Sequence, residues 1–351
     1  MTERNFAKPL FFEKNRVFRV YTGGALFADF FGDDSTDGNF PEEWVASSVE
    51  ALNREKHGER EGVSVTTDGD YFDELIKAYP ADMLGEGRTE FGVLTKLLDS
   101  AIRLPAQAHP DKAFSRKVFH SEYGKAESWL VIATRENAKL YFGFKKPVTK
   151  AEFAAAVERA KTDKNALVPY LNELAVKPGD VYFVPARMAH AIGEGCLILE
   201  VQEPTDFTIQ PDHWCGNYEL NDREMYIGLD HDLALDVFDY TVYGEEAVKR
   251  GRREPKIIEE GDGCKRESLI SYDDTPCFAV ERVTLAKQTV TLNDAPAVYV
   301  VTNGAGKLTW DNGSAPIRKG SYFFLPYAAG NRVHLETAEE ITFAVCLPPV
   351  K

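Results

Sequence analysis

The sequence predicts a mainly β fold with two β-barrels of one type and a small helical insert in the first. Short strand-like runs dominate the chain, and Gly, Pro and Asn bound them at the spacing expected of a sandwich or barrel. One pattern, a charged turn with Gly and then an aromatic strand ending at Pro, occurs twice. Gly179 precedes Pro185 by six residues in K-P-G-D-V-Y-F-V-P, and Gly320 precedes Pro326 by six in R-K-G-S-Y-F-F-L-P. Such an internal repeat indicates a repeated architecture.

The expected strands share an enrichment in β-branched and aromatic residues. They are 17–24, 129–134, 139–144, 180–185, 196–202, 277–285, 297–304 and 321–326. Three stretches favour helix instead. Residues 71–79 place apolar side chains at helical spacing, and 149–160 begins with Thr149 followed three residues later by Glu152, which is typical of a capping box. A further short helix over 165–174 completes the predicted insert near 149–174.

The polar, Gly-containing stretch 243–266 is typical of a linker between the two barrels. We therefore expect a first domain over 1–250 and a second over 251–351. His190 stands five residues after Pro185, whereas Asn331 stands five after Pro326. The second barrel is accordingly expected to carry no metal, with the nearby His334 at its surface.

Composition restricts the possible partners. The chain has 351 residues and a net charge of −15, which argues against nucleic acid or an anionic membrane as a partner. No run of about 18 apolar residues is present, and the first residues lack the features of a secretory signal. Five scattered cysteines predict reduced thiols and a cytoplasmic location. The oligomeric state cannot be inferred from these features.

Four residues in three short strings suggest a metal site: Gln107 and His109 in Q-A-H-P-D, Glu127 in G-K-A-E, and His190 in P-A-R-M-A-H-A. Imidazole nitrogen, carboxylate oxygen and amide oxygen suit a divalent ion such as zinc. Gln107 and His109 are two residues apart, so on a strand both would point to one face. Three protein ligands plus an amide indicate an open, catalytic site; the amide would either ligate the metal directly or hydrogen-bond another ligand.

The same strings, in the same order, resemble the type I phosphomannose isomerases (mannose-6-phosphate isomerases) of the cupin superfamily. L-P-A-Q-A-H-P-D is similar to the family's L-S-V-Q-V-H-P-D, G-K-A-E-S-W to G-K-T-E-x-W, and V-P-A-R-M-A-H-A-I-G to V-P-A-G-T-V-H-A-I-G. Y-T-G-G-A-L, P-E-E-W-V-A-S-S-V and F-G-V-L-T-K-L-L-D-S resemble further family segments, so the resemblance covers most of the chain. It implies two cupin-type jelly-roll barrels.

The resemblance also implies site residues. One Zn²⁺ per chain would be bound by the four candidate ligands. Lys96 and Lys125 would lie in the sugar pocket, and Asp206 matches the family's S-D-x-T aspartate. The chain departs from the family where Gln210 replaces an expected Arg, where Arg187 replaces a Gly, and where Thr22 replaces a Trp.

The resulting hypothesis is a metal-dependent aldose–ketose isomerase that interconverts mannose 6-phosphate and fructose 6-phosphate. Metal would stabilise the developing enediolate, Lys125 would act as the base if its pKa is lowered, and Asp206 would shuttle a hydroxyl proton. Arg187 either supplies the positive charge missing at Gln210, or the neutral amide indicates a different or non-phosphorylated sugar. A non-catalytic sugar-sensing metal cupin and, less favoured by the ligand set, an iron oxygenase are the alternatives.

Overall fold

The computed structural model describes residues 5–350 and is built mainly from antiparallel sheets, which confirms the predicted fold class. A seven-stranded sheet, called sheet 1 here, has the strand order β1-β2-β3-β9-β4-β7-β12. Its strands are β1 (Arg16–Val17), β2 (Glu42–Val45), β3 (Leu94–Ser100), β4 (Glu127–Thr134), β7 (Val181–Val184), β9 (Cys196–Gln202) and β12 (Arg252–Arg253).

An eight-stranded sheet, called sheet 2, follows in the chain. Six strands run in the order β13-β14-β15-β20-β16-β19, and a hairpin of β17 and β18 joins through β20. Its strands are β13 (Lys256–Gly261), β14 (Cys264–Ile270), β15 (Ala279–Thr291), β16 (Ala297–Asn303), β17 (Ala305–Trp310), β18 (Gly313–Arg318), β19 (Tyr322–Leu325) and β20 (His334–Leu347).

Two smaller sheets and the helices complete the fold. The small sheets are β6-β5-β8, from β5 (Lys139–Phe144), β6 (Leu171–Ala175) and β8 (His190–Ile192), and the pair β10 (Trp214–Cys215) and β11 (Tyr218–Glu219). The helices are α1 (Ala25–Phe27), η1 (Ala28–Gly32), α2 (Phe72–Ala78), α3 (Pro80–Leu84), α4 (Lys112–Val118), α5 (Lys150–Ala160), η2 (Val168–Tyr170), α6 (Asp222–Tyr226), α7 (His231–Leu235), α8 (Gly244–Gly251) and η3 (Tyr327–Ala329). In the part of the chain that the structure describes, none of them has the length and apolar character needed to cross a membrane.

The two faces of sheet 1 have different partners because side chains alternate along each strand. One face packs against sheet 2 in a shared core that includes Leu97 and Leu199 on one side and Val298 and Phe324 on the other. The opposite face packs on the small sheet β6-β5-β8 through a second core. The polar site described below lies on this second face.

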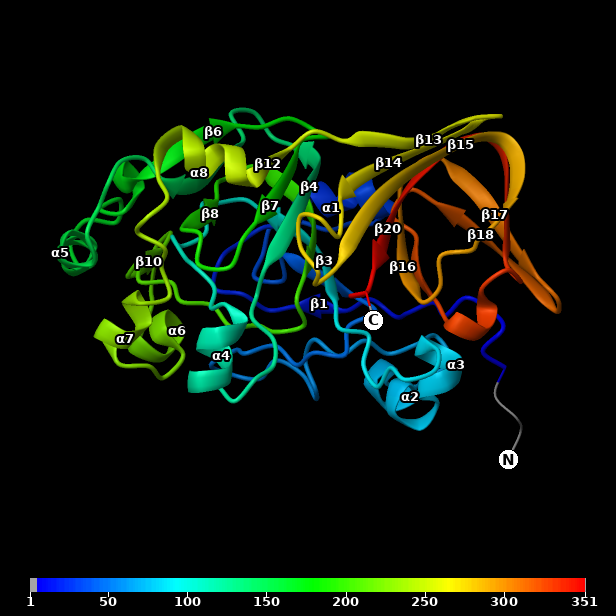
Figure 1. Ribbon diagram of the computed structural model, residues 1–351, viewed down its shortest axis with the longest axis horizontal. Helices are drawn as coiled ribbons and strands as arrows, with labels where there is room; N and C mark the ends of the chain where they lie inside the picture. The colour runs from blue at the N-terminus through cyan, green and yellow to red at the C-terminus, as the bar shows by residue number, and fades with distance from the viewer. Residues whose placement is uncertain (1–4, 351) are drawn as a thin grey trace.

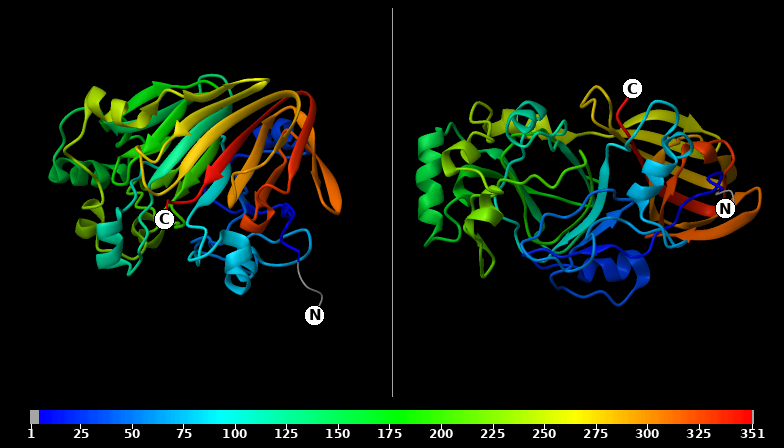
Figure 2. Two further views of the ribbon diagram at one scale, coloured as in Figure 1. Left: turned by 45° about the vertical axis from the view of Figure 1, so that its right-hand side comes forward. Right: turned by 90° about the horizontal axis from the view of Figure 1, so that it is seen from below.

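The ribbon places sheet 1 and the small sheet at one end of the molecule and the orange and red strands of sheet 2 at the other (Figure 1). Helices α5, α6 and α7 cover the outer end of the first part, away from sheet 2, and two further views agree on the outer position of α5 (Figure 2). The first residues also reach sheet 2, since Leu10 forms a β-bridge with Phe324. The division near residue 250 stays a prediction.

Most predicted elements are present, and three differ. Helix α5 has the predicted capping box of Thr149 and Glu152. The expected helix over 165–174 is instead a short 3-10 turn, η2, followed by strand β6. Of the expected strand 17–24, only Val17 lies in a strand. The stretch 243–266, predicted as a linker, is mostly regular structure: α8, β12, β13 and the start of β14. Its charges lie on exposed faces of these elements, which is why its composition resembled that of a linker.

Candidate metal centre and its cavity

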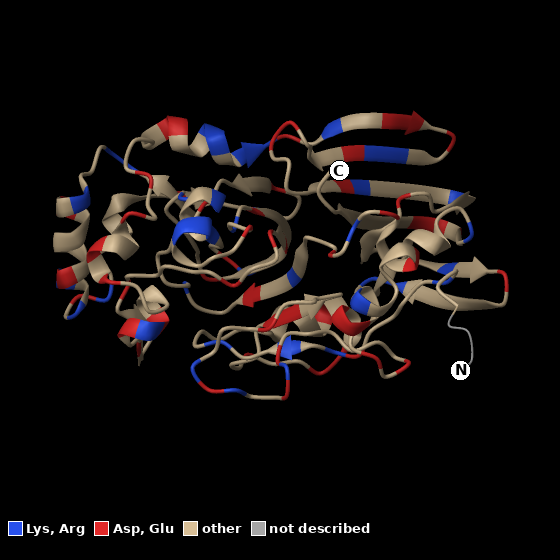
Figure 3. Cartoon of the chain, turned by 60° about the horizontal axis from the view of Figure 1, so that its bottom comes forward, with Lys and Arg blue, Asp and Glu red and all other residues tan. Residues whose placement is uncertain are grey.

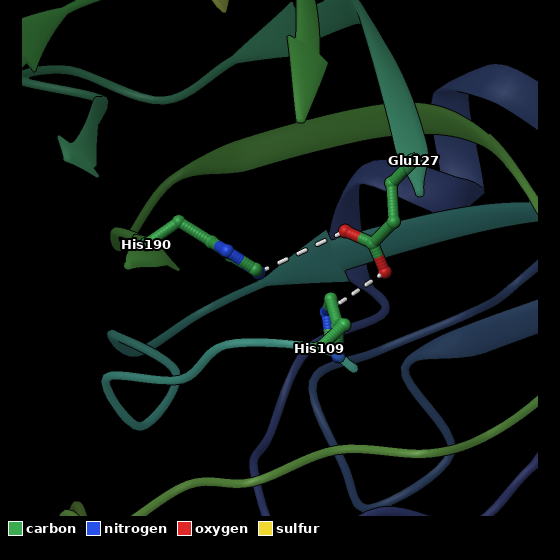
Figure 4. A group of neighbouring side chains, drawn as sticks. All are labelled: His109, Glu127 and His190. Atoms are coloured by element: carbon green, nitrogen blue, oxygen red, sulfur yellow. Dashed lines mark ion pairs between the residues drawn. The ribbon is translucent and has the colours of Figure 1, made fainter. Parts of the chain in front are cut away.

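Three predicted ligands converge between sheet 1 and the small sheet. Glu127 is the first residue of β4, His190 is the first residue of β8, and His109 lies in the segment after β3. Their ligand atoms lie within 4.8 Å of one another. The Glu127 carboxylate stands between the two imidazole rings, with Oε1 3.1 Å from Nε2 of His109 and Oε2 3.8 Å from Nε2 of His190 (Figure 4).

Both histidines are oriented by the backbone. Nδ1 of His109 lies 2.9 Å from the carbonyl oxygen of Phe207, and Nδ1 of His190 lies 2.8 Å from that of Met188. A carbonyl accepts only, so Nδ1 carries the proton of each ring and Nε2 presents a lone pair to the cluster. Nε2 of His190 is buried and has no hydrogen-bond partner among the described residues. Two oriented imidazole lone pairs beside a carboxylate fit a divalent metal ion.

Gln107 lies beside this cluster. Its backbone exchanges two hydrogen bonds with His190, from Gln107 N to His190 O at 2.8 Å and from His190 N to Gln107 O at 2.9 Å. Residues paired in this way project to the same face of the sheet. The amide side chain therefore starts next to His190, on the side predicted from the sequence, and it lines the cavity described below.

Lys125 also joins the cluster. Its ammonium group donates to Oε1 of Glu127 at 2.6 Å and lies 3.2 Å from Nε2 of His109. The side chain is buried, as are the three candidate ligands. The nearest charged neighbour of Lys125 is thus a carboxylate, which favours the protonated ammonium form, whereas a role as base requires a lowered pKa.

Burial controls the protonation of the cluster. Burial lowers the pKa of His190 to about 3, and its electrostatic interaction with His109 acts in the same direction. Burial likewise lowers the pKa of His109, by more than Glu127 raises it. For Glu127, burial would raise the pKa, but His109 and Lys125 outweigh it and hold the pKa well below its usual range. Neutral imidazoles and an ionised carboxylate are the forms that bind metal.

A row of four side chains crosses the same face of sheet 1. The strand register places Trp44 opposite Lys96, Lys96 opposite Glu200, and Glu200 opposite Trp129. Nζ of Lys96 is 3.3 Å from Oε1 of Glu200, and Nε1 of Trp129 donates to Oε2 of Glu200 at 3.0 Å. The Trp129 ring then contacts the His190 ring, with centroids 5.3 Å apart. The row therefore leads directly to the candidate metal centre.

Glu200 differs electrostatically from the other carboxylate that flanks Lys96. Burial raises the pKa of Glu200 to about 7, and the negative charge of Glu127 adds to the effect. Burial would also raise the pKa of Glu42, but Arg19 and Lys96 outweigh it and lower the pKa to about 2. Glu42 is therefore an anion, whereas Glu200 exchanges its proton near neutral pH.

Arg19 links this network to Asp206. Its Nε lies 3.0 Å from Glu42 and its Nη2 lies 3.2 Å from both carboxylate oxygens of Asp206. Asp206 also accepts a hydrogen bond of 2.9 Å from the backbone N–H of Leu52. The aspartate predicted to shuttle a proton is thus held by an arginine and by the backbone.

A cavity of about 640 Å³ adjoins this network. Its wall includes Arg19, Gln107, Asp206 and Gln210, so it extends from the side of the candidate ligands to the outer loops. The three buried ligands themselves do not line it. Gln210 is fixed at its wall because its Nε2 donates to the carbonyl of Glu224 at 2.9 Å.

Arg187 lies outside the cavity, and the geometry does not favour the catalytic role predicted for it. Its Nη2 donates to the carbonyls of Asp236 at 3.0 Å and Phe238 at 3.5 Å, and its Nη1 lies 3.6 Å from Asp111. The side chain is 43% exposed. The residue has a φ of 73°, a conformation that glycine adopts freely, which accounts for the Gly found in the resembling motif.

Sequence reasoning missed Glu200, Glu42 and Arg19 as members of the site. Two of them carried a signal: Glu200 is the one charged residue in the mostly apolar run C-L-I-L-E-V-Q, and Arg19 interrupts V-F-R-V-Y. A charged residue on a strand that is buried on both faces needs a partner, and at such positions it often belongs to a functional site.

The fold and the cluster together define a mainly β protein with a buried, two-histidine, one-carboxylate centre suited to a metal. No family model matches the chain. Its sequence is similar to mannose-6-phosphate isomerase ManA of Bacillus subtilis (strain 168), with 28% identity over 94% of this chain and 95% of that one. It is also 28% identical to mannose-6-phosphate isomerase of Streptococcus mutans, over 91% of this chain and 93% of that one. The resemblance predicted from the motifs is thus confirmed.

Solved structures agree on the fold. The mannose 6-phosphate isomerase from Bacillus subtilis matches with a TM-score of 0.76 and 22% identity, over 96% of this chain and 99% of that one. A putative mannosephosphate isomerase from Archaeoglobus fulgidus matches with a TM-score of 0.71 and 19% identity, over 97% of this chain and 98% of that one.

Proposed function

We propose that the protein is a metal-dependent isomerase that interconverts mannose 6-phosphate and fructose 6-phosphate. The observation that carries the proposal is the cluster of His109, Glu127 and His190, in which two backbone-oriented imidazoles face one carboxylate. The names of the sequence relatives supply the reaction and the substrate.

The candidate ligands are His109, Glu127, His190 and the amide of Gln107, and we propose one Zn²⁺ per chain. The set of imidazole nitrogens and carboxylate and amide oxygens, with both imidazoles neutral, supports zinc. When bound, zinc would polarise the oxygens on C1 and C2 and stabilise the enediolate charge. The second part of the chain, 251–351, is proposed to be metal-free and to support sheet 1 through the shared core.

Proton transfer between C1 and C2 needs a group that changes protonation near neutral pH. Lys125 lies directly beside the ligands, and Glu200 has a pKa of about 7. Lys96 holds the Glu200 carboxylate from the neighbouring strand. We propose that Lys125 orients the substrate oxygens near the metal, while Glu200 in its ionised form accepts the proton from one carbon and returns it to the other. Asp206, fixed by Arg19, is proposed to position a sugar hydroxyl rather than to shuttle its proton.

Location is proposed on composition alone. All five cysteines are free thiols, and four of them are buried. Free thiols persist in reducing compartments, which supports the cytoplasm.

A coupled assay tests the function. Purified protein with its native metal is supplied with mannose 6-phosphate, and fructose 6-phosphate is measured. We expect turnover that chelation abolishes and added Zn²⁺ restores, with metal analysis giving about one zinc per chain. Binding of the sugar phosphate without turnover would instead identify a sensor, and turnover only with free mannose would indicate a non-phosphorylated substrate.

A further inference from the structure

The cavity contains three arginines, and their charges are not equally compensated. Arg19, at the inner end, is paired with Glu42 and Asp206. Arg54 and Arg223 also line the cavity and are exposed. Neither forms an ion pair with a carboxylate in residues 5–350. The uncompensated positive charge of the cavity therefore lies at Arg54 and Arg223.

We propose that Arg54 and Arg223 bind the phosphate group of the substrate at the outer end of the cavity. The inference rests on the proposed function and names the residues that would give it specificity for a phosphorylated sugar. The reacting carbons and the phosphate stand at opposite ends of a hexose 6-phosphate. The cavity has the matching order, with Gln107 next to the candidate ligands and the two exposed arginines on the outer loop at Arg54 and on helix α6.

The two segments that carry the arginines are held by hydrogen bonds of neighbouring residues, and these bonds connect them to the inner site. Arg54 follows Leu52, whose backbone N–H binds Asp206, and Asn53, whose side chain accepts a hydrogen bond of 3.0 Å from Arg19. Arg54 contacts the hydroxyl of Tyr218. That hydroxyl donates to Glu224 at 2.8 Å, next to Arg223 in α6. The chain of contacts joins the two arginine-bearing segments across the cavity.

Gln210, which replaces the Arg expected from the family resemblance, lies near Arg223. Its backbone N–H donates to the carbonyl of Met225 at 2.9 Å, and its amide donates to Glu224, so it is bonded to α6. A neutral side chain at 210 thus lies beside the helix that carries Arg223. Arg223, and not Arg187, is positioned to supply positive charge to this part of the cavity.

Charge chemistry supports phosphate as the ligand. The chain carries −15, and Figure 3 shows acidic and basic residues interspersed along it, so an anionic substrate needs local cations. Arginine presents a planar fork that matches phosphate oxygens. Three carboxylates share the wall, Glu55, Asp206 and Glu224, and Asp206 is paired with Arg19. Both oxygens of Glu224 already accept hydrogen bonds, from the Tyr218 hydroxyl and the backbone N–H of Asn221.

Steady-state kinetics of the zinc-loaded full chain test the assignment. Arg54→Gln and Arg223→Gln should each raise KM for mannose 6-phosphate about tenfold, and the double variant should raise it further, while kcat changes less than about twofold. The split is expected because the phosphate is remote from the reacting carbons and is held equally in the ground and transition states. Arg250→Gln, which makes the same charge change on the exposed face of α8, is the matched control.

A binding measurement separates this inference from the proposed function. Inorganic phosphate is titrated into wild-type protein, the three arginine variants and the control by calorimetry. Weaker phosphate binding in the cavity variants alone supports the assignment even if mannose 6-phosphate proves not to be a substrate. Unchanged phosphate binding, or an unchanged KM in the double variant of an active enzyme, overturns it.

Discussion

Strands β7 and β19 occupy equivalent positions in the repeated turn-and-strand pattern, but their surroundings differ in polarity. Around β19 the interior is apolar: Tyr299 stacks on Phe323 with ring centroids 4.9 Å apart, within a cluster of buried aliphatic and aromatic residues. The face of sheet 1 that includes β7 combines an apolar core with the buried charges of Lys96, Glu127 and Glu200. In residues 251–350 the one buried charged side chain is Glu267.

This difference in polarity indicates that the interior around β19 is a structural core, whereas the face of sheet 1 that includes β7 carries the candidate site. A charge transferred into a protein interior is costly unless it is paired and hydrogen-bonded, so a core built for stability alone is apolar. The first part of the chain retains several such charges and compensates them through the register of β2, β3, β9 and β4. In residues 5–350 the buried charges thus gather around the first copy of the repeated pattern, where we propose the chemistry takes place.

The largest effect is expected when the metal ligands are removed. Alanine at any one of the three candidate ligands (His109→Ala, Glu127→Ala or His190→Ala) should strip the metal and lower kcat/KM by at least about a thousandfold. Each variant removes one of the two imidazoles or the single carboxylate that would bind the metal. Metal analysis and the coupled assay measure both losses, and circular dichroism checks the fold. His334→Ala, at the exposed start of β20, is the matched control. Full metal content with full turnover in any ligand variant would refute the site.

The second effect concerns stability rather than activity. Phe323→Ala removes a ring that is 2% exposed and should lower the free energy of unfolding by about 3–5 kcal/mol. Metal content and kcat of the folded protein should be unchanged, because the apolar core of sheet 2 shares no residue with the site. Urea unfolding and metal analysis are the measurements, with Ile257→Ala, which is 53% exposed, as the control. A loss of metal would show that the two regions are coupled.

The third effect is a pH dependence of stability in metal-free protein. The pKa of Glu200 is raised from 4.5 to about 7 in the folded state. A carboxyl group whose folded pKa is raised contributes stability below its unfolded pKa, and this contribution is lost as the pH rises from about 4.5 to 7. Relative to wild type, Glu200→Gln should gain stability over this window, on the order of 3 kcal/mol. Urea unfolding at several pH values measures it, with the exposed Glu245→Gln as control. A constant difference between variant and wild type would contradict the buried, protonated Glu200.

The sequence predicted the fold class, and it marked the candidate ligands, because strand periodicity and short motifs are local properties. The convergence of Glu127 and His190, 63 positions apart by their numbering, required the further assumption that they arrive on neighbouring strands with the same facing. The role of Arg187 depended on where one side chain points, and its guanidinium is bound to backbone carbonyls and does not line the cavity. The row of Trp44, Lys96, Glu200 and Trp129 depends on how strands distant in the sequence are aligned with one another. The sequence of a single strand does not contain this register.

The smallest effect is expected at Arg187, and it distinguishes two sources of cavity charge. If Arg187 replaced the Arg missing at position 210, Arg187→Ala would lower kcat/KM for mannose 6-phosphate at least about tenfold, or roughly 1.4 kcal/mol of transition-state stabilisation. The structure predicts a change below about threefold instead, because the guanidinium is bound to the carbonyls of Asp236 and Phe238 and does not line the cavity.

The backbone N–H of Arg187 donates to the carbonyl oxygen of His109 at 2.7 Å, and this backbone contact survives the substitution. Arg187→Gly, which suits the positive φ, should behave like the alanine variant. A tenfold loss in both variants would mean that Arg187 reaches the substrate, and the charge attributed to Arg54 and Arg223 would then have to be shared with it.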